Sequence, residues 1–435
     1  MTGFVLGMPS IVSSSFRVNC GATMRAMLIN TGTELLLGDV QDAHLAFVAR
    51  EILPLGLRIE ERRTVPDSDV IRRTLIELFG HCEILFVTGG LGPTTDDITR
   101  EMVAESLGLE LHQDPELLAW LQQRLKVRGI KWSSSIARQA DVLAGAQVLP
   151  NEYGSAPGFY LRANINPRVP SPHVFVLPGP PRELQPMFRK FAMPILKSII
   201  KVPLPVERRS YNIAGVGESL VENAIGKKVL AIPGIELGYC ARPGEVEVRV
   251  IGSPNGIQAA DAVIRRELGV SIFSDNDEAL EEVVVRLLNQ RKQTLATAES
   301  CTGGLIASQL TNVSGASEVF LAGYVTYANS AKSDVLNVDS KLIAKHGAVS
   351  EAVARAMAEG VRARTGSTYG LATTGVAGPT GGSDEKPVGT VYIALALGDS
   401  ETVVRKLFFP TDRETFKQLA AQAALDLLRR RVLKQ

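Results

Sequence analysis

From Ala26 onwards, short apolar runs alternate with stretches of amphipathic, helical periodicity. The first five segments are AMLINTG, AHLAFVAREILPLG, LRIEERRTV, VIRRTLIELFG and EILFVTGG. Helix-length connections between successive strands predict right-handed crossovers and a parallel sheet with helices on its faces. The pattern continues through the strand HVFVLPG and the segment PRELQPMFRKFAMPIL. We therefore predict a first α/β domain over residues 26–199.

Two further modules follow this domain. Residues 200–274 read as a strand, a helix, a strand pair and a second helix, which predicts a small, KH-like α+β domain. Residues 275–435 return to the alternating pattern and end in a long helix. The predicted fold class is therefore α/β: two three-layer α/β domains with mainly parallel sheets, joined by the small α+β domain. A length of 435 residues agrees with this, because it exceeds one ordinary core.

Composition restricts the classes of partner. The formal net charge is +1 and the Lys and Arg residues are scattered, so a nucleic-acid partner is not expected, although the Gly-rich GVGES turn invites comparison with the GXXG loop of one RNA-binding module. No apolar run in the sequence is long enough to cross a bilayer. Residues 1–25 lack a basic leader and are expected to be a disordered extension. The four cysteines lie far apart, which favours a reducing cytoplasm: Cys20, Cys82, Cys240 and Cys301.

The heptapeptide AESCTGG, residues 298–304, lies between an apolar run and a helical stretch. It places Ser300, Cys301 and Thr302 at a predicted helix mouth. Exposed backbone N–H groups and two glycines at such a turn favour covalent catalysis or anion binding. A polar N-cap closed by a Gly-rich turn explains the same residues without any ligand.

Two assignments of a nucleophile and its base are open. Tyr327 and Lys332 are five residues apart, so both could reach one pocket if a helix begins at Asn329. A desolvated lysine near a tyrosine can deprotonate a serine without histidine. Cys301 with His346 is the rival pair, since cysteine is the better intrinsic nucleophile. Spacing in the sequence does not decide between the two pairs.

A second constellation lies in the first domain. FVTGGLGPTTDD, residues 86–97, reads as a strand that ends in a Gly-rich turn followed by hydroxyls and two carboxylates. Gly-rich loops before helices bind phosphates, and Asp96 with Asp97 could hold a bridging divalent cation. The pattern matches neither the P-loop nor the dinucleotide fingerprint. A helix N-terminus with acidic first-turn residues is the alternative that needs no ligand.

The C-terminal motifs together resemble one family. AESCTGG, VTYAN-x-AK, HGAVSE and GVAGPTGGSDEKPVGTV are similar to the CinA C-terminal domain, the PncC family of nicotinamide mononucleotide deamidases, over nearly all of residues 276–435. The resemblance implies Ser300 as nucleophile, Lys332 as base and Tyr327 as its relay, with Cys301 and His346 in supporting roles and no cofactor. It implies oxyanion, phosphate and ribose contacts from the Gly-rich turns and one arginine: Thr302, Gly303, Gly304, Gly375, Ala377, Gly378, Gly381, Gly382 and Arg413.

The N-terminal motifs point to the same family. NTGTELLLGD, TGGLGPTTDD, GSAPGF and LPGPPRELQPMF resemble the CinA N-terminal domain, which shares its fold with the molybdopterin-binding MoaB, MogA and MoeA proteins. The resemblance implies ADP-ribose pyrophosphatase activity with a divalent Mg, Mn or Co ion at Asp96 and Asp97. The implied substrate contacts are Thr31, Gly32, Glu34, Gly89, Gly90, Gly92, Thr94, Arg138, Pro157, Gly158, Pro178 and Gly179.

The chain departs from the family at two places in this half. Asp42-Ala43-His44 stands where an Asn-Thr-Asn run is usual, and Arg138 stands where a lysine is common. Arginine keeps the charge but cannot serve as a tunable base.

The resemblance thus implies a cytoplasmic, homodimeric enzyme of pyridine-nucleotide salvage that acts on nicotinamide mononucleotide and ADP-ribose. The alternatives are a molybdopterin-related binding protein and a competence- or damage-associated regulatory protein with an inactive N-terminal domain.

Overall fold

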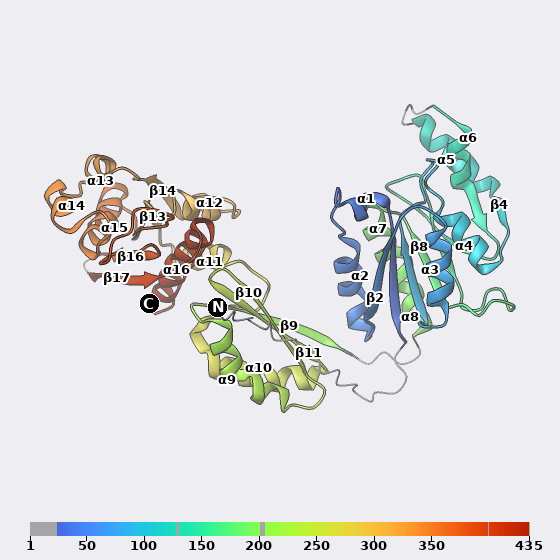
Figure 1. The fold of residues 1–435 in the computed structure, drawn as a ribbon, viewed down its shortest axis with the longest axis horizontal. Coiled ribbons are helices and arrows are strands. Elements are labelled where there is room, and N and C mark those ends of the chain that lie inside the picture. Colours follow the sequence, from blue (N-terminus) through green and yellow to red (C-terminus); the bar gives the residue numbers. More distant parts are fainter. Residues whose placement is uncertain (1–23, 128, 130, 201–204, 399, 435) are drawn as a thin grey trace, which may run out of the picture. The chain divides into compact units, whose positions relative to one another are not determined.

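The computed structural model describes residues 24–127, 129, 131–200, 205–398 and 400–434 (Figure 1). The predicted extension therefore lies outside the described residues, apart from Met24 and Arg25. Contacts divide the chain into two compact units, Met1–Glu207 and Arg208–Gln435. The second unit contains both the predicted small domain and the predicted C-terminal domain.

The first unit is built on a six-stranded sheet with the order β2-β1-β3-β8-β7-β6. Neighbours from β2 to β8 are parallel, whereas β7 and β6 continue the sheet in antiparallel fashion. The mainly parallel α/β architecture expected from the sequence is confirmed. The strands are β1 (Ala26–Thr31), β2 (Ile59–Val65), β3 (Ile84–Thr88), β6 (Gln147–Leu149), β7 (Gly158–Leu161) and β8 (His173–Leu177).

Helices cover both faces of this sheet (Figure 1). Alternate residues of β1 enter different cores, Ala26 and Leu28 on one face and Met27 and Ile29 on the other, because successive strand side chains point to opposite faces. The first core contains α2, α7 and α8, and the second contains α3 and α4. The helices are α1 (Thr33–Leu37), α2 (His44–Ile52), α3 (Val70–Phe79), α4 (Thr99–Leu107), α7 (Pro181–Met187) and α8 (Met193–Ile199).

The segment between α4 and β6 contains elements that the sequence analysis did not predict. It contains a two-stranded antiparallel sheet, one long helix and one short helix. Its elements are β4 (Leu111–Gln113), α5 (Pro115–Val127), α6 (Ser134–Ala137) and β5 (Asp141–Leu143).

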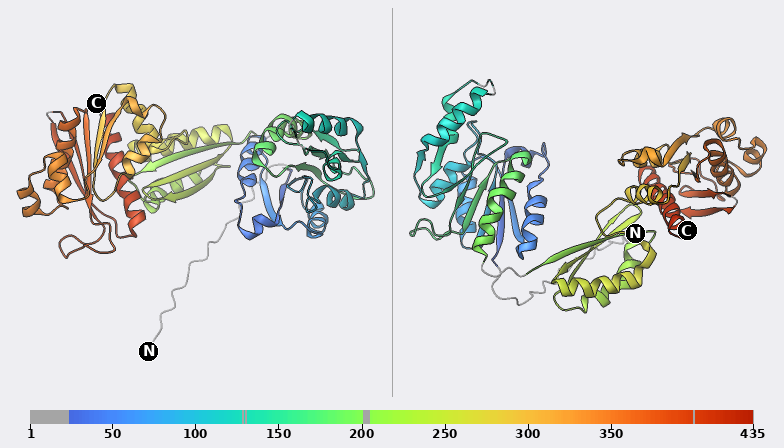
Figure 2. Two further views of the ribbon diagram at one scale, coloured as in Figure 1. Left: turned by 90° about the horizontal axis from the view of Figure 1, so that it is seen from above. Right: turned by 180° about the vertical axis from the view of Figure 1, so that it is seen from behind.

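The small domain begins the second unit. Its sheet has the order β10-β11-β9-β12, and α9 and α10 pack on one face of it (Figure 2). The order of elements agrees with the α+β domain expected from the sequence. The elements are β9 (Glu207–Ala214), α9 (Glu218–Leu230), β10 (Glu236–Arg242), β11 (Glu245–Gly252), α10 (Pro254–Leu268) and β12 (Ile272–Ser274).

The C-terminal domain has a five-stranded sheet with the order β14-β13-β15-β16-β17. Strands β14, β13 and β15 are parallel, and β16 and β17 extend the sheet in antiparallel fashion. Helices α11, α12 and α16 share one core with the sheet, and α13, α14 and α15 share the other. The strands are β13 (Leu295–Glu299), β14 (Phe320–Val325), β15 (Tyr369–Gly375), β16 (Thr390–Leu397) and β17 (Ser400–Phe408). The helices are α11 (Leu280–Arg291), α12 (Leu305–Thr311), α13 (Asn329–Leu336), α14 (Ser340–His346), α15 (Glu351–Thr365) and α16 (Arg413–Leu433).

A buried ion pair on α16 joins this domain to the small one. Arg429 is 1% exposed and donates to Asp426 Oδ1 at 2.7 Å and to the Val270 carbonyl at 2.6 Å. Arg430 donates to the other oxygen of Asp426 and to the Ala214 carbonyl. Because the guanidinium groups bind backbone of the small domain, the two domains pack as one unit. In the part of the chain that the structure describes, no helix has the length and apolarity needed to span a membrane.

Candidate functional sites

Ser300 lies at the point where the strand order of the C-terminal sheet reverses. The chain leaves β13 for β14 on one side and later enters β15 on the other. Open α/β sheets bind ligands at such switch points, beyond the carboxyl ends of the strands. Ser300 directly follows β13, and its backbone N–H donates to the Thr373 carbonyl of β15 at 3.0 Å. The serine is thus held at the crevice between the two central strands.

The buried carboxylate of Glu299 supports the turn after Ser300. Glu299 is 1% exposed, and it accepts backbone N–H groups from Gly304 at 2.9 Å, Ile306 at 3.2 Å and Ala307 at 2.9 Å. These are first-turn donors of α12, which have no partner within a helix. The carboxylate stabilises them and also complements the positive helix end. Gly304, at φ 92°, lets the chain reverse tightly between β13 and α12.

Glu299 therefore accepts hydrogen bonds from backbone N–H groups that the sequence analysis considered as contacts for a ligand. Gly304 binds Glu299, and the Gly303 N–H donates to the Ser300 carbonyl. Within the described residues, the N–H groups of Cys301 and Thr302 donate to no other residue. They are the candidate oxyanion donors, one and two residues after the serine.

Lys332 projects from α13 to the serine. Its Nζ lies 3.1 Å from Ser300 Oγ, 2.8 Å from the Thr326 carbonyl and 3.2 Å from the Tyr327 carbonyl. A neutral amine has two N–H groups and one lone pair, so the two carbonyls can take the N–H groups and leave the lone pair aimed at Ser300. The side chain is 1% exposed, and this burial lowers the pKa of Lys332.

Cys301 faces the hydrophobic core instead of this crevice. It is 5% exposed and packs in the cluster that contains α11, α12 and α16. Burial raises the pKa of the Cys301 thiol to about 12, so the thiol stays protonated at neutral pH. No hydrogen bond joins it to His346 among the described residues, and His346 ends α14 with its carbonyl accepting from Lys386. The geometry therefore brings together Ser300 and Lys332, not Cys301 and His346.

Tyr327 and Arg413 meet at the rim of the site. The Tyr327 side chain is 60% exposed, and its hydroxyl accepts from Arg413 Nη2 at 2.8 Å. Arg413 Nη1 donates to the Gly378 carbonyl at 2.9 Å. The Tyr327 backbone contacts Lys332, but its hydroxyl has no hydrogen bond to Ser300 or Lys332. Arg413 thus links the segment before α13 to the loop after β15.

The remaining candidates of this half lie in the turn between β13 and α12 and at or beyond the end of β15. Thr302 is buried, and its hydroxyl pairs with that of Thr373 at 2.7 Å. Gly375 ends β15, Ala377 and Gly378 are buried beyond it, and Gly381 and Gly382 are exposed. A further cation near the turn, Lys417, was not found from the sequence, although its spacing of four from Arg413 on a predicted helix was a usable signal.

The first unit contains a pocket of about 570 Å³ beyond the carboxyl ends of β1, β3 and β8. Ten of the candidate residues line it: Thr31, Gly32, Glu34, Gly89, Gly90, Gly92, Asp96, Asp97, Pro178 and Gly179. Thr94, Arg138, Pro157 and Gly158 do not line it. Gly158 instead packs in β7, where an added Cβ would lie 2.8 Å from the Val176 carbonyl. The lining residues missed from the sequence include Asp67, Gln139, Ser155, Ala156 and Glu183.

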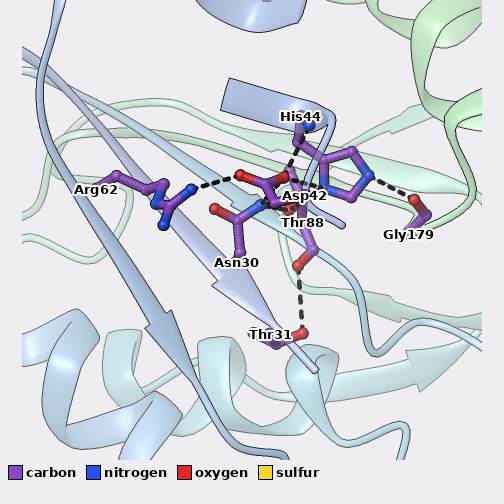
Figure 3. A network of polar contacts seen from close by, with 7 residues as sticks. All are labelled: Asn30, Thr31, Asp42, His44, Arg62, Thr88 and Gly179. Atoms are coloured by element: carbon purple, nitrogen blue, oxygen red, sulfur yellow. Dashed lines mark hydrogen bonds and ion pairs between the residues drawn. The ribbon is translucent and has the colours of Figure 1, made fainter. Parts of the chain in front are cut away.

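The unusual Asp42-Ala43-His44 run also lines this pocket. Figure 3 shows Asp42 and His44 in a network of polar contacts. His44 is 8% exposed; its Nδ1 lies 3.1 Å from Asn30 Nδ2 and 3.0 Å from Thr88 Oγ1, and its Nε2 lies 2.6 Å from the Gly179 carbonyl. Since a carbonyl only accepts, the proton is on Nε2 and Nδ1 is the acceptor. His44 therefore ties the ends of β1 and β3 to the loop after β8.

The carboxylates expected to bind metal are on the pocket wall but form no complete ligand set. Asp97 Oδ2 accepts from the Thr94 N–H at 2.9 Å, and a hydrogen bond from the Thr94 side chain lowers the pKa of the exposed Asp96. Among the described residues, no group of three His, Cys, Asp or Glu side chains is arranged to hold a metal. Two carboxylates do fit a Mg²⁺ ion that also binds substrate phosphates. Arg138 instead pairs with Glu101 at 2.8 Å.

Comparison with known proteins matches a family model to each of the two large domains. A family model described as the CinA C-terminal domain matches residues 277–432, and one described as a probable molybdopterin binding domain matches residues 27–198. A CinA-like protein of Akkermansia muciniphila is 40% identical over 402 residues, which cover 92% of this chain and 96% of the relative. A putative competence-damage inducible protein of Caldicellulosiruptor bescii is 37% identical over 94% of this chain and 100% of its own length.

Among solved structures, the competence damage-inducible protein A of Klebsiella pneumoniae is 37% identical. The match covers 35% of this chain and 95% of that one, with a TM-score of 0.35.

Replacement of His44 tests its structural role. His44→Ala leaves the Gly179 carbonyl without its donor and the buried Thr88 hydroxyl without its acceptor, so the free energy of unfolding of the first unit should fall by about 1–3 kcal/mol. Denaturant-dependent hydrogen exchange of β1 and β3 measures this for the unit alone. The exposed His112→Ala serves as control and should change it by less than about 0.5 kcal/mol. Equal stability of the two variants would show that the His44 contacts contribute nothing.

Proposed function

The chain belongs to the CinA family, and we propose that its C-terminal domain is an amidohydrolase that converts nicotinamide mononucleotide to nicotinate mononucleotide and ammonia. The contact between Lys332 Nζ and Ser300 Oγ at 3.1 Å carries this proposal. A serine beside a desolvated lysine is a nucleophile with its own base. Nicotinamide mononucleotide as the substrate is what the resemblance of the Ser300, Tyr327 and Lys332 motifs implies.

In the first step Ser300 Oγ attacks the carboxamide carbon while Lys332 Nζ takes the hydroxyl proton. The oxyanion is stabilised by the N–H groups of Cys301 and Thr302, which are preorganised for charge that develops in the transition state. The protonated Lys332 then gives its proton to the departing amide nitrogen, and ammonia leaves. In the second step Lys332 deprotonates a water that hydrolyses the ester on Ser300, so one base serves both steps.

We propose a second activity, metal-dependent hydrolysis of ADP-ribose to AMP, for the pocket of the first unit. The observation that favours a metal-dependent reaction is the charge of the pocket: the described residues that line it include Glu34, Asp42, Asp67, Asp96, Asp97 and Glu183 but no Lys or Arg. A pyrophosphate can enter such a pocket only with cations that offset its charge. A divalent ion bound to the phosphates would polarise them for attack, and Asp96 and Asp97 would hold it. The cytoplasmic location and the homodimer stay predictions.

Separate substitutions of the two candidate nucleophiles test the deamidase activity. Ser300→Ala should lower ammonia release from nicotinamide mononucleotide by about 10⁴-fold or more, because the covalent route is lost. Cys301→Ser should keep most of the activity, since the thiol lies in the core. Ammonia is measured in a coupled assay, and circular dichroism verifies the fold of each variant. An inactive Cys301 variant beside an active Ser300 variant would reverse the assignment.

The pH profile tests the role of Lys332. The amine accepts the serine proton only when neutral, so kcat/KM should rise with pH until Lys332 is deprotonated and then reach a plateau. Because burial lowers the pKa of Lys332, the midpoint should lie below the ordinary lysine value of about 10.4. Lys332→Met should lose both the activity and this rising limb. A midpoint at or above the ordinary value would contradict a desolvated base.

Chelation separates the two activities. A chelator should abolish AMP release from ADP-ribose and leave ammonia release unchanged, because only the first-unit pocket is proposed to need a metal. Asp96→Asn should lower AMP release by about 100-fold, as expected when one ligand of a catalytic ion is lost. Glu110→Gln, an exposed carboxylate outside the pocket, is the matched control. No AMP release by the unaltered protein with Mg²⁺, Mn²⁺ or Co²⁺ would exclude this activity.

A further inference from the structure

Lys417 is a second cation beside the Ser300 turn. It lies one helical turn after Arg413 on α16, so the two side chains share one face of the helix. Its Nζ is 3.6 Å from the position that a Cβ of residue 303 would occupy. The side chain is half-buried, and it has no hydrogen bond or ion pair with any residue that the structure describes.

The other described cations around this turn, Arg413 and Lys332, already have hydrogen-bond partners. Both terminal nitrogens of Arg413 donate, one to Tyr327 Oη at 2.8 Å and one to the Gly378 carbonyl at 2.9 Å. Lys332 is buried, donates to two carbonyls and contacts the serine. The carboxylate of Glu299 is occupied by three N–H groups of α12, so it does not pair with Lys417. Among the residues that the structure describes around this turn, Lys417 is therefore the positive charge that remains available to an anionic ligand.

The distance to the nucleophile is suitable for such a ligand. The Gly303 N–H donates to the Ser300 carbonyl at 3.2 Å, which closes the turn and keeps the two residues within about 7 Å of each other. Gly303 is exposed and has no side chain to block the path between them. A substrate whose carboxamide is at Ser300 can thus place a phosphate at Lys417.

We propose that Lys417 binds the phosphate of the mononucleotide substrate, and that Arg413 instead positions Tyr327 and the loop after β15. This inference rests on the proposed deamidase function and assigns the residue that selects phosphorylated substrates.

The test compares nicotinamide mononucleotide with nicotinamide riboside, which differs only by the phosphate. Lys417→Met keeps the apolar stem and removes the charge. It should raise KM for the mononucleotide by about tenfold or more, as for a lost charge-assisted hydrogen bond, with little change in kcat and no change for the riboside. Lys417→Arg should restore most of the affinity. Arg413→Ala should lower kcat on both compounds to a similar extent.

Lys434→Met, at the exposed far end of the same helix, is the matched control and should behave like the unaltered protein. An equal effect of Lys417→Met on both compounds, or no effect, would overturn the proposal. So would loss of phosphate selectivity in Arg413→Ala with Lys417→Met unaffected.

A binding measurement distinguishes failure of the inference from failure of the proposed function. Absence of ammonia release by the unaltered protein would reject the deamidase. The proposed role of Lys417 in phosphate binding can still be tested, by measuring whether inorganic phosphate protects residues 300–304 from hydrogen exchange. Protection that is lost in Lys417→Met supports the anion site, and protection that is equal in both proteins, or absent from both, rejects it.

Discussion

The C-terminal site depends on the buried carboxylate of Glu299. Without it, three N–H groups at the start of α12 would lose their partner, at a cost of about 1–3 kcal/mol for each one that is buried from water. With it, the turn between β13 and α12 has one stable conformation, and Ser300 is held beside Thr373 of the neighbouring strand. The same bonds decide which donors remain: among the described residues, the N–H groups of Cys301 and Thr302 donate to no other residue, whereas those of Gly304, Ile306 and Ala307 donate to Glu299.

Burial then gives the adjacent nucleophilic side chains of Ser300 and Cys301 different environments. Ser300 opens to the crevice and meets Lys332, whereas Cys301 turns into the core, where burial raises the pKa of its thiol to about 12. Burial acts on Lys332 in the opposite direction, because the charged form of an amine is the one that loses solvation. One low-dielectric environment therefore disables the thiol as a nucleophile and favours the neutral amine as a base.

The first unit also has its candidate site at the carboxyl ends of its parallel strands, but the residues there differ in charge. Its pocket lies beyond the ends of parallel strands, but the lining is acidic and the loops are joined by His44. The sequence identified the Asp42-Ala43-His44 run only as a departure from the family. In the structure, Asp42 and His44 form a network with Asn30 and Thr88 that connects the strand ends.

The sequence by itself determined the fold class, the order of elements in the α/β and α+β modules and the motifs that meet at the strand ends, because periodicity and Gly-rich turns are local signals. The helix start at Asn329, which the sequence analysis used as a condition for bringing Tyr327 and Lys332 together, is where α13 begins. Only the tertiary structure decided which side chains meet: Lys332 with Ser300, Tyr327 Oη with Arg413 and Arg138 with Glu101. The elements between α4 and β6 were also missed. Contacts between residues far apart in the chain depend on packing and burial, and no local pattern encodes them.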